Sequence, residues 1–166
     1  PYQFSVFGYK SACFAVINCD IRLDEKTIKI PSSKGIIDSD QRILGVAYGP
    51  GIGDTRFSPV EDFYRRLSMC FDDIKCHDPF VSMWTELNLE IETSLETFFN
   101  DKFDVLIVTT GHKDYLINDV IYNQIKNADE EMIIIDTVGL LDLNKLPAHY
   151  SQNKNFYVLG VGHNEE

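Results

Sequence analysis

The residues best suited to chemistry lie in one short stretch, residues 45–59, which reads GVAYGPGIGDTRFSP. It joins a glycine-rich loop and the side chain of Arg56 to a sequence typical of a helix start. Ser58 suits the N-cap, Pro59 suits the first helical position, and Glu61 has the spacing of a capping box. The first N–H groups of a helix carry partial positive charge, and arginine offers a planar fork of donors. The chemistry predicted for this stretch is therefore binding of a phosphate or a carboxylate.

The same residues also have a purely structural interpretation. The glycines suit a flexible turn between a strand and a helix. Arg56 can pair with Asp54 or Glu61 at the surface, and such pairs contribute only about 0 to 1 kcal/mol. Asp54 and Thr55 have short polar side chains, which shape loops by bonding to nearby backbone. The residue types alone leave both interpretations open.

Neither a dinucleotide site nor a metal site is expected in this chain. The dinucleotide fingerprint needs a third glycine three residues after Gly51, and Asp54 occupies that position. Gly160 and Gly162 lie near the end of the sequence, with no helix predicted after them. The histidines lack the short spacing typical of metal ligands; they are His77, His112, His149 and His163.

Composition limits the class of protein. A length of 166 residues fits one domain plus an extension. The net charge of -11 argues against nucleic acid or an anionic membrane as a partner. No apolar run is long enough to cross a membrane, and residues 13–17 are too short a run for a signal peptide. The four cysteines show no paired spacing, which predicts free thiols and a cytoplasmic location. Because the sequence begins with Pro1, we expect it to be a piece of a longer protein.

From residue 43 onward, predicted strands alternate with predicted helices. The strands are residues 43–48, 74–77, 105–109, 132–135 and 156–159. One predicted helix begins at the N-cap Ser58, and two more cover residues 93–100 and 115–126. Apolar residues recur at helical spacing in this part of the sequence. This alternation predicts an α/β domain with a mostly parallel sheet and helices on both faces.

Polar residues follow several of these strands. They are the loop of residues 49–56, Asp78, Gly111 with His112, and Asp136. Because ligands of parallel sheets bind at the carboxyl ends of the strands, we expect these residues to lie at one edge. Residues 1–38 differ: segments 14–22 and 26–30 predict a β-hairpin-like extension, which leaves 39–166 as the main domain.

The sequence resembles a known family at the residues Ala47, Tyr48, Asp54, Thr55, Arg56, Ser58 and Pro59. They match the motif of the C-terminal, nucleotide-sugar-binding domain of the UDP-glucose/GDP-mannose dehydrogenase family, although Gly49 stands where that family has a lysine. Weaker matches follow after the later strands, so the resemblance covers roughly residues 39–163. It implies a Rossmann-like three-layer domain.

The resemblance also implies a function. The chain would bind the UDP part of a nucleotide sugar as the substrate domain of a nucleotide-sugar 6-dehydrogenase of polysaccharide biosynthesis. The implied binding residues are Tyr48, Gly49, Gly51, Asp54, Thr55, Arg56 and Ser58. The family's catalytic cysteine stands in a Gly-Gly-x-Cys context, which none of the four cysteines has, so we expect no catalysis by this chain alone. NAD would belong to a full-length relative, and the partner would be an NAD-binding domain outside this chain or a second copy of it.

Two rival hypotheses stay open. One is a stand-alone module that binds nucleotide sugars for regulation. The other is a structural domain that has kept the fold without the ligand, because a fold does not determine a function.

Overall fold

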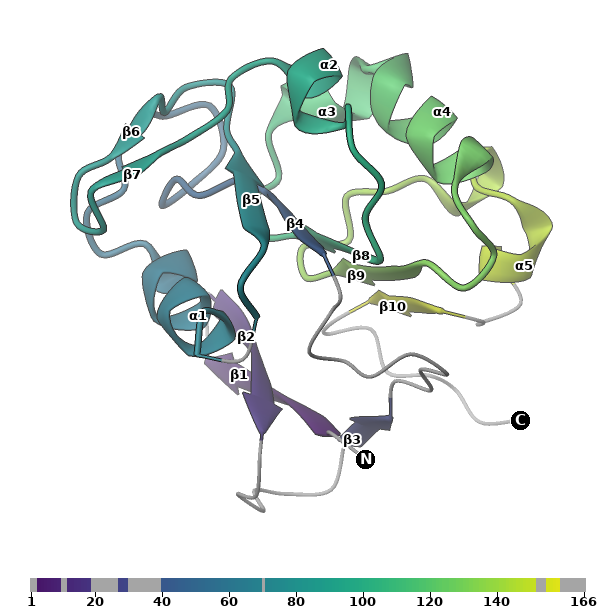
Figure 1. Cartoon of the computed structure of the whole chain (residues 1–166), viewed down its shortest axis with the longest axis horizontal. Coiled ribbons are helices and arrows are strands. Elements are labelled where there is room, and N and C mark those ends of the chain that lie inside the picture. The colour runs from purple at the N-terminus through teal and green to yellow at the C-terminus, as the bar shows by residue number, and fades with distance from the viewer. Residues whose placement is uncertain are drawn as a thin grey trace.

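A parallel sheet of five strands forms the centre of the protein. The computed structural model describes residues 3–9, 12–18, 27–29, 40–69, 71–151 and 155–158. The strand order is β10-β9-β8-β4-β5, and all neighbours are parallel (Figure 1). The strands are β4 (Gln41–Leu44), β5 (Ile74–His77), β8 (Val105–Val108), β9 (Ile133–Asp136) and β10 (Phe156–Val158). The predicted Rossmann-like α/β fold is confirmed.

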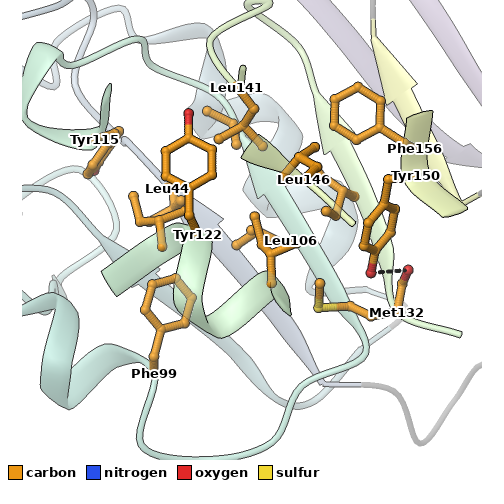
Figure 2. Close-up of a cluster of buried hydrophobic side chains, with 14 of the residues drawn as sticks. Leu44, Phe99, Leu106, Tyr115, Tyr122, Met132, Leu141, Leu146, Tyr150 and Phe156 are labelled. Carbon is orange, nitrogen blue, oxygen red and sulfur yellow. Dashed lines mark hydrogen bonds between the residues drawn. The ribbon is translucent and has the colours of Figure 1, made fainter. Parts of the chain in front are cut away.

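Apolar side chains alternate between the two faces of the sheet, as the strand geometry requires. On one face, Ile43 and Ile107 pack with helix α1 (Pro59–Leu67) through Val60 and Phe63. The other face carries a second cluster, which includes Leu44 and is drawn in Figure 2. The helices over it are α2 (Leu95–Phe98), α3 (Lys113–Ile117), α4 (Asp119–Asn127) and α5 (Ala148–Ser151). The short helix η2 (Leu143–Lys145) lies in the chain between Leu141 and Leu146 of the same cluster. The sheet is thus the middle layer of three.

The helix predicted over residues 115–126 is wrong as one element. The structure divides it into α3 and α4 at Asn118, which has extended dihedral angles. The Asn118 side chain accepts a hydrogen bond from the N–H of Val120 at 2.9 Å and so caps α4. Asparagine favours such caps over helix interiors because its amide competes for backbone groups. The helix predicted over 93–100 is only α2, capped by Ser94.

The start of α1 is predicted correctly, but its capping box is not. Ser58 is the N-cap and accepts from the N–H of Val60 at 3.3 Å, with Pro59 in the first turn. The Ser58 N–H donates to the carbonyl of Thr55 rather than to Glu61. The Glu61 carboxylate instead accepts two hydrogen bonds from Arg65. A helical ion pair at i,i+4 has replaced the reciprocal cap.

Strand β4 ends earlier than predicted, at Leu44 rather than residue 48. The next residue, Gly45, has φ 91°, which turns the chain out of the sheet. The other four predicted strands match β5, β8, β9 and β10 to within a residue at each end inside the described range.

The N-terminal strands form a separate antiparallel sheet in the order β2-β1-β3. They are β1 (Gln3–Tyr9), β2 (Ala12–Asn18) and β3 (Thr27–Lys29), and β2 lies beside α1 (Figure 1). The predicted pairing of segments 14–22 and 26–30 is wrong, because β1 lies between β2 and β3. Residues 19–26 and 30 of that prediction lie outside the described residues.

Five of the described elements were not predicted, namely β1, η2, α5, β6 and β7. Strands β6 (Met83–Trp84) and β7 (Leu89–Glu90) form a hairpin after β5, which is too short to show an alternating pattern.

In the described residues, no helix has the length and apolar character needed to cross a membrane.

Candidate functional site

The candidate site lies where the strand order reverses. Along the chain β4 is followed by β5 on one side of it and then by β8 on the other. Leu44, His77 and Val108, the last residues of these three strands, are register partners, so the strands end at one level. Such a reversal leaves a crevice at the carboxyl ends, which is where parallel sheets bind ligands. The loop of residues 46–56, hereafter the glycine loop, leaves β4 at this point.

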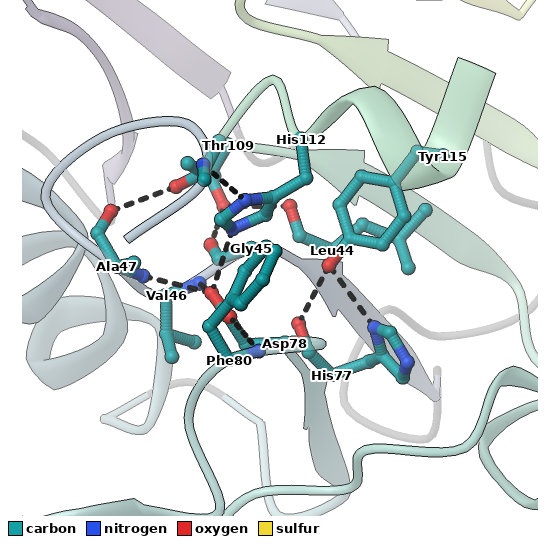
Figure 3. Close-up of polar contacts among 12 residues, drawn as sticks. Leu44, Gly45, Val46, Ala47, His77, Asp78, Phe80, Thr109, His112 and Tyr115 are labelled. Atoms are coloured by element: carbon teal, nitrogen blue, oxygen red, sulfur yellow. Dashed lines mark hydrogen bonds and ion pairs between the residues drawn. The ribbon is translucent and has the colours of Figure 1, made fainter. Parts of the chain in front are cut away.

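Asp78, immediately after β5, ties the start of the glycine loop to the sheet. Its Oδ2 atom accepts hydrogen bonds from the N–H groups of Val46 at 2.9 Å and Ala47 at 3.0 Å, and its Oδ1 accepts from Phe80 at 2.9 Å. Figure 3 shows the carboxylate between this backbone and the ring of His112. Asp78 is fully buried, and burial alone would raise its pKa. The hydrogen bonds from His112 and from the backbone prevail, and the pKa of Asp78 lies below its ordinary value.

His112, which follows β8, connects Asp78 to the tip of the glycine loop. Its Nδ1 accepts the Gly51 N–H at 3.0 Å, and its Nε2 lies 3.0 Å from Asp78 Oδ2. A backbone N–H can only donate, so Nδ1 carries no proton and the proton is on Nε2. The imidazole is therefore neutral here, and it donates to a charged carboxylate.

Close backbone approach joins the ends of β4 and β8. A Cβ atom at Gly45 would collide with the Cβ of Thr110 and would lie 2.8 Å from its backbone nitrogen. The Thr110 hydroxyl donates to the carbonyl of Ala47 at 2.9 Å, and the Thr109 hydroxyl donates to the carbonyl of Gly45. The base of the loop is thus fixed by contacts that need glycine at position 45.

His77, beside Asp78, belongs to a second buried group that does not contact the glycine loop. Its Nδ1 lies 3.0 Å from the hydroxyl of Tyr115, which also donates to the His77 carbonyl (Figure 3). Burial lowers the pKa of His77 to about 4 and raises the pKa of Tyr115 above its ordinary value. Both side chains are therefore neutral and act in packing.

The structure places Arg56 at the surface, paired with Asp54. Arg56 Nε donates to Asp54 Oδ1 at 2.9 Å and Nη2 donates to Oδ2 at 2.7 Å. Asp54 Oδ1 also accepts the Arg56 N–H at 3.0 Å, which closes a tight turn. These bonds from Arg56 lower the pKa of Asp54 to about 2. This geometry agrees with the structural interpretation of the sequence, in which Arg56 pairs with Asp54 at the surface.

Four further predicted binding residues lie along the same loop. Tyr48 is 60% exposed, and Gly49 and Gly51 lie beside it at the surface. Thr55 is buried, and its hydroxyl donates to Glu86 Oε2 at 2.7 Å, so it holds the loop to the β6–β7 hairpin.

The start of α1 offers fewer donors than the sequence suggested. Pro59 has no N–H, the N–H of Val60 donates to the Ser58 hydroxyl, and the N–H of Glu61 donates to the Ser58 carbonyl. A ligand held at this edge would have to use the glycine loop rather than this helix turn. The residue before the cap, Phe57, is 92% exposed with φ 60°, a strained conformation for phenylalanine.

The expected convergence at the strand ends is confirmed for the glycine loop, Asp78 and His112. Asp136 lies at the same edge, but its carboxylate accepts from Val138 and Leu141 and shapes its own loop. Sequence reasoning did not identify the hydrogen bonds that Asp78 accepts from the backbone N–H groups after β4. The sequence places an aspartate directly after a predicted strand. This indicates where Asp78 lies in the fold, but it does not indicate which groups form hydrogen bonds with it.

Among the described residues there is no group of three histidine, cysteine or carboxylate side chains arranged to hold a metal ion. Cys76 is a buried free thiol whose pKa burial raises. Cys19 and Cys70 lie outside the described residues.

The fold is similar to parts of known sugar-nucleotide dehydrogenases. The UDP-D-ManNAc dehydrogenase from Pyrococcus horikoshii matches with a TM-score of 0.58 and 22% identity, over 75% of this chain and 26% of its own. The NDP-N-acetyl-D-galactosaminuronic acid dehydrogenase from Methanosarcina mazei Go1 matches with 0.55 and 20%, over 74% and 24%. The UDP-N-acetyl-mannosamine dehydrogenase Cap5O from Staphylococcus aureus matches with 0.53 and 16%, over 72% and 26%. The chain thus spans about a quarter of the length of these proteins.

Comparison with curated proteins gave no match. The family model described as the UDP-glucose/GDP-mannose dehydrogenase family, UDP binding domain, matches residues 42–143, which is more than half of the chain. That range contains most of β4 and all of the glycine loop, Asp78 and His112, which together build the site. The chain therefore belongs to the UDP-glucose/GDP-mannose dehydrogenase family, as its C-terminal UDP-binding domain.

Proposed function

We propose that the chain binds the UDP part of a nucleotide sugar at the glycine loop and serves as the substrate domain of a nucleotide-sugar 6-dehydrogenase. The observation that carries this proposal is the place of the family motif: its loop leaves β4 where the strand order reverses. The exposed side of the loop, with Tyr48 and Gly51, is available to a ligand.

Arg56 is the group that would bind a phosphate, although Asp54 now neutralises it. The side chains of Arg56 and Asp54 are 75% and 41% exposed, and an exposed pair of this kind contributes little to stability. A diphosphate can therefore draw the guanidinium away at little cost, and a charge-assisted bond from arginine contributes about 1.5 to 3 kcal/mol when well formed.

Isothermal titration of the chain with UDP, UDP-glucose and UDP-N-acetylglucosamine tests the proposal. We expect saturable binding that Arg56→Ala weakens by about ten- to a hundredfold. Arg66→Ala is the matched control, because Arg66 is an exposed arginine in the last turn of α1, at the other end of that helix from Ser58. The absence of binding by all three ligands would favour the structural-domain rival. Binding that Arg56→Ala leaves unchanged would show that the phosphate lies elsewhere.

A further inference from the structure

A buried polar chain runs from the sheet to the tip of the glycine loop. His112 and Asp78 are both fully buried, whereas Gly51 is exposed. We propose that His112 and Asp78 are positioning residues that hold the glycine loop in its binding conformation, and that they do so only while His112 is neutral. The effect on ligand binding rests on the proposed function; the effect on the loop does not.

The base and the tip of the loop both depend on one carboxylate. Asp78 Oδ2 binds the N–H groups of Val46 and Ala47 at the base directly, and it reaches Gly51 at the tip through the His112 ring. Fixing two points of a short loop removes most of its conformational freedom before any ligand arrives, which lowers the entropy cost of binding.

The hydrogen bond to His112 is an important constraint at the tip. Gly51 has φ 74°, and no heavy atom lies within 4 Å of the place where its Cβ would stand. Packing therefore contributes little there, and loss of the bond would release a glycine that has many alternative conformations.

The charge of His112 decides whether this bond can exist. Protonation would place a hydrogen on Nδ1, so that two donors, Nδ1–H and the Gly51 N–H, would face each other. The bond from Nε2 to Asp78 would persist and gain ionic character. Acidification would therefore release the tip of the loop and leave its base attached.

Few groups around the ring can replace the lost bond. The loop presents its Gly51 N–H, the β5 end presents Asp78, Phe80 and His77, and α3 presents the ring of Tyr115 edge-on at 5.4 Å between centroids. Asp78 is the one anion in this set, and it is already bound to Nε2.

Hydrogen exchange of the Gly51 amide, measured by NMR without ligand, reads the position of the loop directly. In the 166-residue chain, we expect the protection factor of this amide to fall about tenfold or more when the solution is acidified from about pH 8 to about pH 5. His112→Gln keeps a neutral acceptor and donor, so protection should persist without that pH dependence. His112→Phe should lose protection at every pH.

His77→Phe is the matched control, since it removes a neighbouring buried imidazole that does not contact the loop. It should show the wild-type response of Gly51, whatever its effect on overall stability. If His112→Phe does not fold, the wild-type chain and His112→Gln decide by themselves. Equal pH dependence in these two proteins, or no change in wild-type protection across the window, would overturn the proposal.

Titration with UDP-glucose then links the loop to binding. Its diphosphate is esterified at both ends, so it lacks the ionisation near pH 6 of a terminal phosphate. We expect the wild-type affinity to fall about tenfold on acidification and the affinity of His112→Gln to change less than threefold. If the wild-type chain binds no UDP-glucose at any pH, the proposed function fails, while the exchange of Gly51 still tests the positioning role.

Discussion

Gly49 stands where the family has a lysine, and its conformation does not require glycine. The glycines with positive φ in the described residues are Gly45, Gly51 and Gly139. A Cβ atom at Gly49 would meet only the Cδ1 of Ile52, at 3.8 Å, which is ordinary contact. A lysine can therefore be restored at this position without backbone strain.

We expect Gly49→Lys to leave the melting temperature unchanged and to raise the affinity for UDP-glucose about tenfold at low salt, because it adds a charge-assisted bond to phosphate. The gain should shrink as salt screens the new charge. Gly51→Lys is the control: it adds the same charge where φ is 74°, and should lower the melting temperature. Unchanged affinity in a stable Gly49→Lys variant would argue against a phosphate near this residue.

His77 makes stability depend on pH. Its pKa is about 4 in the folded protein and 6.5 in the unfolded chain. Between these values the unfolded state binds more protons, so the free energy of unfolding falls as the pH falls from 6.5 to about 4. The full shift corresponds to a loss of about 3 kcal/mol.

Urea unfolding at a series of pH values measures this loss. His77→Phe should be the less pH-dependent protein in that window, because a phenylalanine has no proton to gain. A wild-type slope that His77→Phe retains in full would show that other groups produce it.

At the scale of elements, the junction of β4 with the glycine loop is the most constrained part of the site. Gly45 combines a φ of 91° with direct apposition to Thr110. Any side chain there must both strain the backbone and push β4 away from the loop after β8, so the junction tolerates glycine alone.

Gly45→Ala should therefore destabilise the protein by about 2 to 4 kcal/mol, the sum of backbone strain and overpacking. Gly49→Ala is the matched control and should change stability by about 0.5 kcal/mol or less, since surface changes without strain are nearly neutral. Thermal unfolding of both variants gives the comparison. Equal melting temperatures would mean that the close approach at Gly45 relaxes freely.

Strands β8, β9 and β10 could be predicted because each is a short, largely apolar run. The break between α3 and α4 could not, because Leu116, Ile117, Val120 and Ile121 continue a helical stripe across Asn118. The stripe is misleading: Ile117 is 83% exposed, and Ile121 is buried. The preference of Asn118 for a cap outweighed the pattern of its neighbours.

The location of the site could be predicted from the sequence, but its hydrogen-bond network could not. The glycine loop, Asp78 and His112 were expected at one edge because each follows a strand. The pairing of donors with acceptors depends on the distance between β4 and β8 and on the turn at Gly45. Neither can be inferred from the types of the residues. The pairing of Arg56 with Asp54 was one of two options in the sequence, and only coordinates separate them.

At the scale of the whole molecule, the net charge of -11 opposes any anionic ligand. Binding of a UDP-sugar must therefore rely on short-range donors in the glycine loop and on Arg56, whose fields act within about 10 Å at ordinary ionic strength. If the proposed function holds, we therefore expect Arg56 to contribute strongly to affinity although the protein as a whole is acidic.

The chain should bind a UDP-sugar without oxidising it. The family's chemistry needs a thiolate nucleophile and a bound dinucleotide, and nothing in the sequence matches the motif of either. Cys76 lies beside His77 but cannot replace the nucleophile, because it is only 5% exposed and burial raises its pKa, which keeps it a thiol.

We therefore expect no formation of NADH above a protein-free control when the chain is mixed with NAD and UDP-glucose or UDP-N-acetylglucosamine. A full-length dehydrogenase of the family, assayed in parallel, shows that the reagents are competent. NADH production that survives further purification and disappears in Cys76→Ala would contradict this prediction and would assign the chain an active site of its own.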